Sequence, residues 1–256
     1  LAKLWETLLA GSDPKSTPQA GRWTQRALAE RTAAGRPVVG GFVTGYEYDW
    51  RRHKVPPKQV QEADPLQFML LDATEQALND AGYDKRPLDR ERCGVAVGTE
   101  FGGDFCDELE LGLRLPEMQA RLAPLLAKRG VTAENIAAIN DKFAATLLKR
   151  YPSLVDETGS FTSSTLASRI SKTLDLAGGA VSIDSGSTAA LSALTICIDT
   201  LLSGDNDIMI CAAGQRRMGL TAFNALDNAG LGAQGAGKHL LDAGYDGIVP
   251  AEGVGA

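Results

Sequence analysis

The sequence predicts a single-domain α/β protein, and three observations lead to this prediction. Three short apolar runs have the length and composition of strands buried inside a sheet. Helix-sized segments, with apolar residues close to a helical period, lie among these runs. The 256 residues are 44% hydrophobic and 23% charged, so the chain has enough apolar material for a core and is not predicted to be disordered.

In chain order, the first 60 residues are predicted to be mostly loop, with one short amphipathic helix over residues 1–10. A longer helix is predicted over residues 64–81. Asp64 can cap its first turn, and Pro65 occupies the first helical position, where a missing N–H costs nothing. A Gly directly after residue 81 is the expected stop for this helix.

The apolar runs that follow are predicted to be strands. They are predicted at residues 93–98, 180–184 and 207–213, all three buried on both faces, with a helix over residues 188–203 between the last two. A strand, a helix and a strand joined by short links form a βαβ unit, which predicts parallel strands and a right-handed crossover. Four Gly among residues 230–237 predict a mobile loop.

Residues 102–156 form a helical insertion between the first and second strands. They are rich in Leu, Ala, Glu, Lys and Arg, and Pro116 and Pro124 divide them into two or three helices. Such a segment is either a solvated helical cap or a functional element, and the sequence leaves both interpretations open.

Composition excludes several classes of protein. With 26 basic and 32 acidic residues the net charge is −6, which argues against a nucleic-acid partner. No run approaches the roughly 18 apolar residues of a membrane span, so we expect a soluble protein with no membrane partner. The four Cys show no metal-ligand spacing, and no export signal is visible at a start that lacks Met. Reduced thiols and a cytoplasmic location are therefore expected, with no metal.

The candidate chemistry lies in the turn Ser182-Ile183-Asp184-Ser185-Gly186-Ser187-Thr188-Ala189-Ala190-Leu191. A strand ends there and a helix begins, so the hydroxyl of Ser187 is expected near unpaired N–H groups and the positive end of the helix dipole. This arrangement can present a nucleophile. The alternative is that Ser185 and Ser187 are simply helix N-cap residues, which the spacing alone favours.

Six blocks of the chain carry a resemblance to a known family. They are Asp64-Pro65-Leu66-Gln67 with its helix, residues 93–98, Leu166-Ala167-Ser168-Arg169-Ile170-Ser171, residues 179–191, Leu202-Ser203-Gly204-Asp205 with Ile210-Cys211-Ala212-Ala213-Gly214, and residues 241–247 with Glu252-Gly253-Val254-Gly255. In this order they resemble the β-ketoacyl synthase (ketosynthase) domains of modular or iterative polyketide and polyunsaturated-fatty-acid-type synthases. The resemblance implies a thiolase-like fold of α-β-α layers, of which this chain is the N-terminal half.

The resemblance also implies an acyltransferase of the 3-oxoacyl carrier-protein synthase type. In the family mechanism an acyl group passes to a nucleophilic Cys, and a decarboxylated extender unit then attacks it in a Claisen condensation. Ser187 stands at the Cys position, with Ser185, Gly186 and Thr188 forming the nucleophile and oxyanion turn around it. Because a serine hydroxyl needs a base to attack a thioester, Ser187 is expected to be the poorer nucleophile.

Besides Ser187 at the Cys position, the histidines also depart from the family pattern. The motifs that supply two catalytic His lie in the second half of such domains, and His53 and His239 fit neither of them. Both are predicted to be surface or loop residues. A non-condensing homologue, resembling a chain-length factor or a decarboxylating ketosynthase, is therefore the alternative function. A serine hydrolase is a more distant third, since it needs a His and a carboxylate beside Ser187.

The partners implied by the resemblance are an acyl carrier protein, whose phosphopantetheine is the substrate arm, and a second copy of the chain in a homodimer. No bound cofactor is implied. Acidic residues at 107, 108 and 110 would not attract an acidic carrier protein. Basic pairs at Arg216-Arg217 and Lys149-Arg150 are the better candidates for its docking, although charge runs are usually solvated faces.

Overall fold

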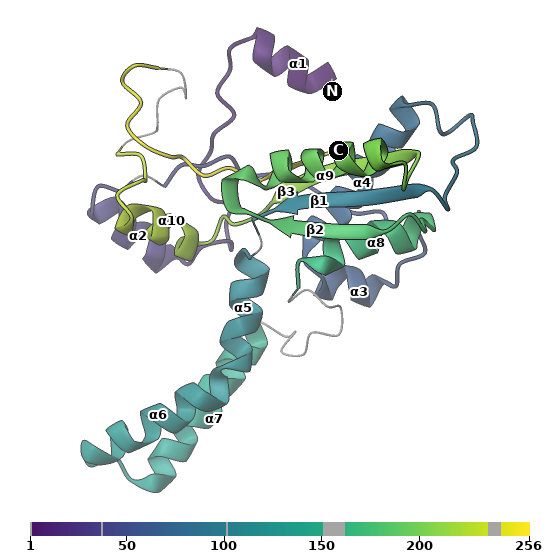
Figure 1. The fold of residues 1–256 in the computed structure, drawn as a ribbon. Helices are drawn as coiled ribbons and strands as arrows, with labels where there is room; N and C mark the ends of the chain where they lie inside the picture. The colour runs from purple at the N-terminus through teal and green to yellow at the C-terminus, as the bar shows by residue number, and fades with distance from the viewer. Residues whose placement is uncertain (1, 37, 101, 151–161, 235–241) are drawn as a thin grey trace.

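The computed structural model describes residues 2–36, 38–100, 102–150, 162–234 and 242–256. In these ranges a four-stranded sheet is covered by helices on both faces (Figure 1). The helices are α1 (Ala2–Leu9), α2 (Gln25–Ala33), α3 (Pro57–Glu62), α4 (Pro65–Asp80), α5 (Asp104–Leu113), α6 (Leu115–Lys128), α7 (Ala133–Arg150), α8 (Ser164–Leu174), α9 (Ala189–Ser203) and α10 (Leu220–Asn228). The strands are β1 (Cys93–Thr99), β2 (Ala180–Asp184), β3 (Ile208–Gln215) and β4 (Gly253–Gly255), and a short 3₁₀ helix, η1 (Gly186–Thr188), precedes α9.

The sheet has the order β2-β1-β3-β4. β1 is parallel to both β2 and β3, whereas β4 is antiparallel to β3. The three predicted strands are confirmed, but β2 and β3 are not neighbours, because β1 lies between them. The β2-α9-β3 unit therefore crosses over a strand that comes earlier in the chain. β4 was not predicted, since three residues containing two Gly carry no strand pattern.

Burial differs between the strands. All seven residues of β1 are buried, as expected for a central strand. The same expectation was wrong for β2, which is half-buried to exposed along its whole length. β2 lies at the edge of the sheet, where the described residues provide a neighbouring strand on one side only.

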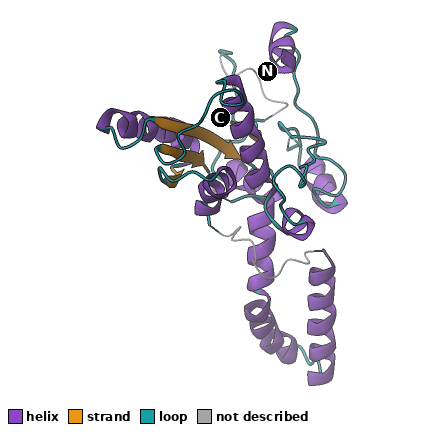
Figure 2. Cartoon of the chain, turned by 90° about the vertical axis from the view of Figure 1, so that its right-hand side faces the viewer, coloured by secondary structure: helices purple, strands orange, loops and turns teal. Residues whose placement is uncertain are grey.

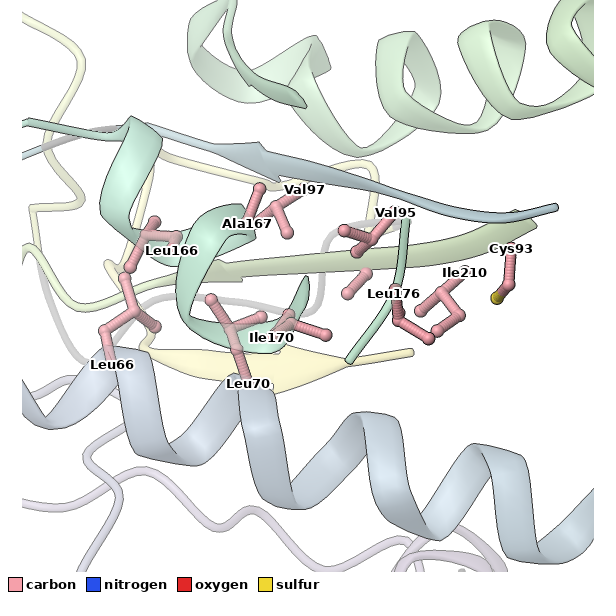
Figure 3. Close-up of a cluster of buried hydrophobic side chains, with 11 residues drawn as sticks. Leu66, Leu70, Cys93, Val95, Val97, Leu166, Ala167, Ile170, Leu176 and Ile210 are labelled. Atoms are coloured by element: carbon pink, nitrogen blue, oxygen red, sulfur yellow. The ribbon is translucent and has the colours of Figure 1, made fainter. Parts of the chain in front are cut away.

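The sheet lies between two helical layers. α4 and α8 cover one face, where Leu66, Leu70 and Ile170 meet Val95 and Val97 of β1 in the main hydrophobic core (Figure 3). α9 covers the opposite face. There the alternate residues of β1 are small, so the helix backbone can approach the sheet closely.

The cap and the stop that were predicted for the helix over residues 64–81 are confirmed in α4. The Asp64 carboxylate accepts a hydrogen bond from the backbone N–H of Leu66 at 2.9 Å, and Pro65 lies in the first turn. Gly82 follows the helix with φ at +84°, a conformation that a residue with a Cβ rarely adopts.

The first 60 residues contain more helix than predicted. Besides α1, the structure has α2 and α3, which the polar composition of this region concealed. α2 lies beside α10, and the Trp23 ring meets the Phe223 ring edge to face with centroids 4.8 Å apart. These contacts join residues 200 positions apart in the sequence, so no local pattern could predict them.

Three helices, α5, α6 and α7, occupy most of the predicted insertion. They extend away from the sheet as an arm, in which α6 and α7 pack against each other (Figure 2). Pro116 lies in the first turn of α6, whereas Pro124 lies inside that helix rather than between helices. Residues 151–156 of the predicted insertion, and 235–237 of the predicted mobile loop, lie outside the described residues.

The segment Gly186–Ser203 is long and apolar enough, by length and composition alone, to cross a membrane. Its burial pattern gives another reason for this composition. Ala193 and Cys197 of α9 face β1 and β3, while Leu191 and Leu202 on other faces are exposed. We interpret α9 as a central helix that packs on the sheet with one side and offers an apolar surface on the other.

Candidate active site

The turn that carries Ser187 joins the end of β2 to the start of α9. Gly186 adopts a φ of +59°, in the left-handed region that favours Gly, and allows the chain to turn sharply after β2. Residues 186–188 then form η1, and α9 follows directly. Ser187 therefore lies at the amino end of a continuous helical segment, near the positive end of its dipole. The next two N–H groups, of Thr188 and Ala189, already donate to the carbonyl oxygens of Ser185 and Gly186.

Gly98, near the end of β1, allows the start of α9 to lie directly against the sheet. A Cβ built on Gly98 would lie 2.3 Å from the carbonyl oxygen of Ala189 and 2.8 Å from the N of Ala190. Real Cβ atoms do not approach backbone that closely, so only Gly fits. The close packing of α9 on β1 thus depends on a missing side chain.

A pocket of about 470 Å³ lies at the carboxyl ends of β1 and β3. It is lined by Gly98, Thr99, Glu100, Gly186, Ser187, Ala189, Ala190, Ala213, Gly214, Gln215, Ala251, Glu252, Gly253 and Val254. Open α/β sheets bind ligands at the carboxyl ends of their strands, and helix amino ends favour negative charge. The pocket combines both features with the Ser187 hydroxyl.

Of the predicted site residues, Ser187 and Gly186 line the pocket, whereas Ser185 and Thr188 do not. Ser187 itself is exposed, so the pocket does not enclose it. Its hydroxyl has no hydrogen-bond partner among the described residues. The N-cap interpretation holds for Ser185 by position only: it is the N-cap residue of η1, but its side chain makes no capping bond and its Oγ lies 3.0 Å from the Oγ of Ser192. The N-cap residue of α9 is Thr188, not Ser187.

Thr188 and Ser185 stabilise the turn from outside the pocket. The Thr188 hydroxyl donates to the Ser185 carbonyl oxygen at 2.8 Å. This bond ties η1 to the residue before it. We therefore assign both residues to the support of the turn, while the backbone around Ser187 remains open to a ligand.

Two carboxylates of the pocket are held by arginines. Glu252, whose side chain is fully buried, accepts two hydrogen bonds from the Arg22 guanidinium at 2.6 and 2.5 Å and a third from the N–H of Val43 at 2.7 Å. Glu100 pairs with Arg217 at 2.5 Å. Both carboxylates are thus engaged, and neither is free to act as the base for Ser187.

Sequence reasoning missed Glu100, Glu252 and their arginine partners. Glu252 belongs to one of the six family-like blocks. Its ion pair with Arg22 could not be predicted, because Arg22 lies 230 positions earlier in the sequence. Of the predicted docking residues, Arg217 is paired with Glu100, and Arg216 lies 3.6 Å from Glu252. The side chains of Lys149 and Arg150 lie outside the described residues.

Histidine is absent from the described lining of this pocket. His53 lies in a turn, as the loop alternative of the prediction expected, although its side chain is only 8% exposed. Its Nδ1 lies 2.6 Å from the Tyr48 hydroxyl and its Nε2 2.5 Å from a carboxylate oxygen of Glu75. His239 lies outside the described residues. The described part of the pocket therefore lacks the His that a serine hydrolase needs.

The cysteines do not replace the missing thiol nucleophile. None of the four forms a disulfide, and none lines the pocket. Burial raises the pKa of Cys93 to about 11 and that of Cys197 to about 12, which makes both thiols unreactive at neutral pH. Within the described ranges, no three His, Cys, Asp or Glu side chains are gathered as metal ligands would be.

Solved structures show which fold this protein has. A ketosynthase from module 6 of the bacillaene synthase of Bacillus subtilis superposes with a TM-score of 0.67 over 99% of the chain, at 18% identity. An oxazolomycin ketosynthase domain of Streptomyces albus gives 0.69 over 99%, at 19% identity. The protein has the thiolase-like fold of ketosynthase domains, as the sequence predicted, and spans 36% and 39% of those two chains.

The sequence comparisons agree with this class. The family model "Beta-ketoacyl synthase, N-terminal domain" matches residues 1–256, so the chain belongs to that family. A polyunsaturated fatty acid synthase from a Thraustochytrium species is 28% identical over 214 residues, which are 82% of this chain and 7% of that protein. Pikromycin polyketide synthase component PikAII of Streptomyces venezuelae is 28% identical over 260 residues, 98% of this chain and 6% of the relative. The chain thus spans a small part of these relatives.

Proposed function

We propose that the protein transfers an acyl group from a carrier-protein thioester to Ser187 and then extends it by decarboxylative Claisen condensation. The observation that carries this proposal is the position of the Ser187 hydroxyl: it lines a pocket at the carboxyl ends of β1 and β3, at the amino end of α9, with no hydrogen-bond partner among the described residues. Membership of the β-ketoacyl synthase family supports the reaction class.

In the first step, Ser187 Oγ forms a bond to the thioester carbonyl carbon while the carbon–sulfur bond breaks. The hydroxyl proton goes to the departing thiolate, and the acyl group remains as an oxyester. Negative charge develops on the carbonyl oxygen in the transition state. Backbone N–H groups of the turn around Ser187 are suited to stabilise it, because they are oriented before the reaction begins.

In the second step, a malonyl-type extender loses carbon dioxide, and the resulting enolate carbon attacks the oxyester carbonyl. The carbon–oxygen bond to Ser187 breaks, and the serine alkoxide takes a proton from water. The partners proposed for this cycle are an acyl carrier protein, with its phosphopantetheine as the substrate arm, and a second copy of the chain. We propose a cytoplasmic location for it.

A homodimer is supported by the edge strand β2. Its outer edge has no described neighbouring strand, and its residues Ala180 and Val181 are exposed. An apolar edge strand of this kind readily pairs with another chain. Light scattering on the wild type and on a Val181→Lys variant tests this: we expect a dimer that the charged edge weakens, and a wild-type monomer would contradict it.

Acylation is tested by incubating the complete protein with a labelled acyl carrier thioester, followed by intact-mass and peptide analysis. We expect one acyl group on the peptide containing Ser187. Ser187→Ala should abolish the label, whereas Ser203→Ala, at the opposite end of α9, should retain it. Label that persists in the Ser187→Ala variant, or no label on the wild type, would refute the acyl transfer to Ser187.

A second candidate function is favoured by the described pocket itself, which contains no Cys, no His and no unpaired carboxylate. In this alternative the protein is a non-condensing homologue that shapes an acyl tunnel or pairs with an active partner. Release of carbon dioxide from a malonyl thioester without chain extension supports this alternative. Condensation by the purified homodimer would contradict it.

A further inference from the structure

A second polar pocket lies on the opposite layer from α9, between α8 and the start of α4. Its volume is about 390 Å³, and its lining is polar: Gln59, Gln67, Thr165, Ser168, Arg169, Ser171 and Lys172. Five of these seven residues come from α8. None of them lines the pocket of Ser187.

Arg169 is the central group of this second pocket. Its Nε donates to the Oε1 of Gln67 at 3.0 Å, and its guanidinium lies 5.4 Å from the centroid of the Phe68 ring. Gln67 and Phe68 are both buried in α4. Gln67 therefore holds one edge of the guanidinium, and the Phe68 ring supports one of its faces. The remaining N–H groups have no hydrogen-bond partner among the described residues.

Among the described residues, no carboxylate compensates the charge of Arg169. Within the described ranges, no Asp or Glu lies within ion-pair distance of it, in contrast to Arg22, Arg31 and Arg217. Burial lowers the pKa of Arg169, since the charged form has lost hydration without gaining a counter-ion. A half-buried guanidinium that is held in place and has no counter-ion among the described residues is suited to bind an anion.

Neighbouring residues supply further donors. Lys172 follows Arg169 by three positions on the same helix, which places the two side chains on one face, and it too has no described ion-pair partner. The hydroxyls of Ser168 and Ser171 also lack hydrogen-bond partners among the described residues. A single carboxylate would need only the N–H groups of the Arg169 guanidinium. Two cations together with free hydroxyls match an anion with more oxygens and more charge.

We propose that the pocket between α8 and the start of α4 binds an oxyanion of the phosphate class, held by the guanidinium of Arg169 and the ammonium of Lys172. The source of this anion is either free inorganic phosphate or an organic phosphate ester such as 4′-phosphopantetheine. The site does not depend on the reactivity of Ser187, so it stands whether or not the proposed acyl transfer is correct.

The test is a titration of the complete protein with inorganic phosphate and, separately, with 4′-phosphopantetheine, followed by phosphorus NMR at constant ionic strength. We expect saturable binding that Lys172→Gln weakens about tenfold, because one charge-assisted hydrogen bond is lost. Arg169→Met should remove binding. Arg169→Lys, which keeps the charge without the fork, should bind more weakly than the wild type.

Lys128→Gln is the matched control, since it removes the same charge from an exposed position in the last turn of α6. Equal loss of binding in Lys128→Gln and Lys172→Gln would mean attraction to overall charge and would overturn the proposal, as would no saturable binding. Tighter binding of 4′-phosphopantetheine than of phosphate would identify an ester as the ligand, and equal affinity would identify the free anion. If Arg169→Met does not fold, Lys172→Gln and Ser171→Ala decide the outcome.

Discussion

Gly98→Ala should both destabilise the protein and displace the candidate nucleophile. The added Cβ would lie 2.3 Å from the carbonyl oxygen of Ala189, whereas ordinary contact begins at 3.4 Å. The start of α9 must therefore move by about 1.1 Å, because the obstructing atoms are backbone and cannot rotate away. Overpacking of this kind costs about 1–3 kcal/mol of unfolding free energy.

The displacement has a second consequence, because Ser187 precedes Ala189 by two residues. A misplacement of about 1 Å at a reacting group can reduce a rate by about 100-fold. We therefore expect Gly98→Ala to lower the urea midpoint by an amount equivalent to about 2 kcal/mol. We also expect it to slow acylation of Ser187 by one to two orders of magnitude.

Gly255→Ala is the matched control, since a Cβ there meets no atom within 4 Å. It should change the unfolding free energy by less than about 0.5 kcal/mol. A Gly98→Ala variant that unfolds at the wild-type urea concentration and acylates at the wild-type rate would refute the close approach of α9 to β1. Loss of stability with an unchanged rate would refute the link between this contact and the position of Ser187.

Three further predictions concern a buried ion pair, the reactivity of position 187 and the hydroxyl of Tyr48. Glu252→Gln breaks the buried pair with Arg22 and should cost about 3 kcal/mol in urea unfolding, whereas Glu30→Gln, in an exposed pair with Arg26, should leave the urea midpoint close to that of the wild type. Similar costs for the two variants would contradict the burial of Glu252. In Ser187→Cys, the introduced thiol at the start of α9 should react with iodoacetamide at neutral pH at least about tenfold faster than Cys93 or Cys197, as peptide mapping would measure. Equal rates would argue against the position of residue 187. Burial raises the pKa of Tyr48 from 10.0 to about 12, so this hydroxyl stabilises the fold below pH 10 and the contribution is lost as the pH rises toward 12. Tyr48→Phe should therefore lose less stability than the wild type between pH 9 and about 11; an identical pH profile would exclude this contribution.

Local signals predicted the elements that form the sheet layers. Asp64, Pro65 and Gly82 mark the ends of α4 because caps and stops act through neighbouring backbone groups. The apolar run of β1 and the turn before α9 were predicted for the same reason, since strand burial and a helix start leave a pattern within a few residues. The ordered motifs then identified the family, which the comparisons confirm.

Long-range pairing was outside the reach of such signals. The burial of His53 depends on Tyr48 and Glu75, and the position of Glu252 depends on Arg22 from the other end of the chain. Likewise, the exposed edge of β2 follows from the order of the strands and not from its apolar composition. These features arise when distant segments meet, so only coordinates could reveal them.

The sequence by itself therefore determined the fold class, the main elements and the candidate nucleophile, because each depends on short-range backbone chemistry. Only the tertiary structure decided which side chains surround Ser187. It showed that the carboxylates of that pocket are neutralised by arginines, while Arg169 on the opposite layer has no counter-charge among the described residues. Charge compensation depends on distances across the fold, and the order of residues in the chain does not specify those distances.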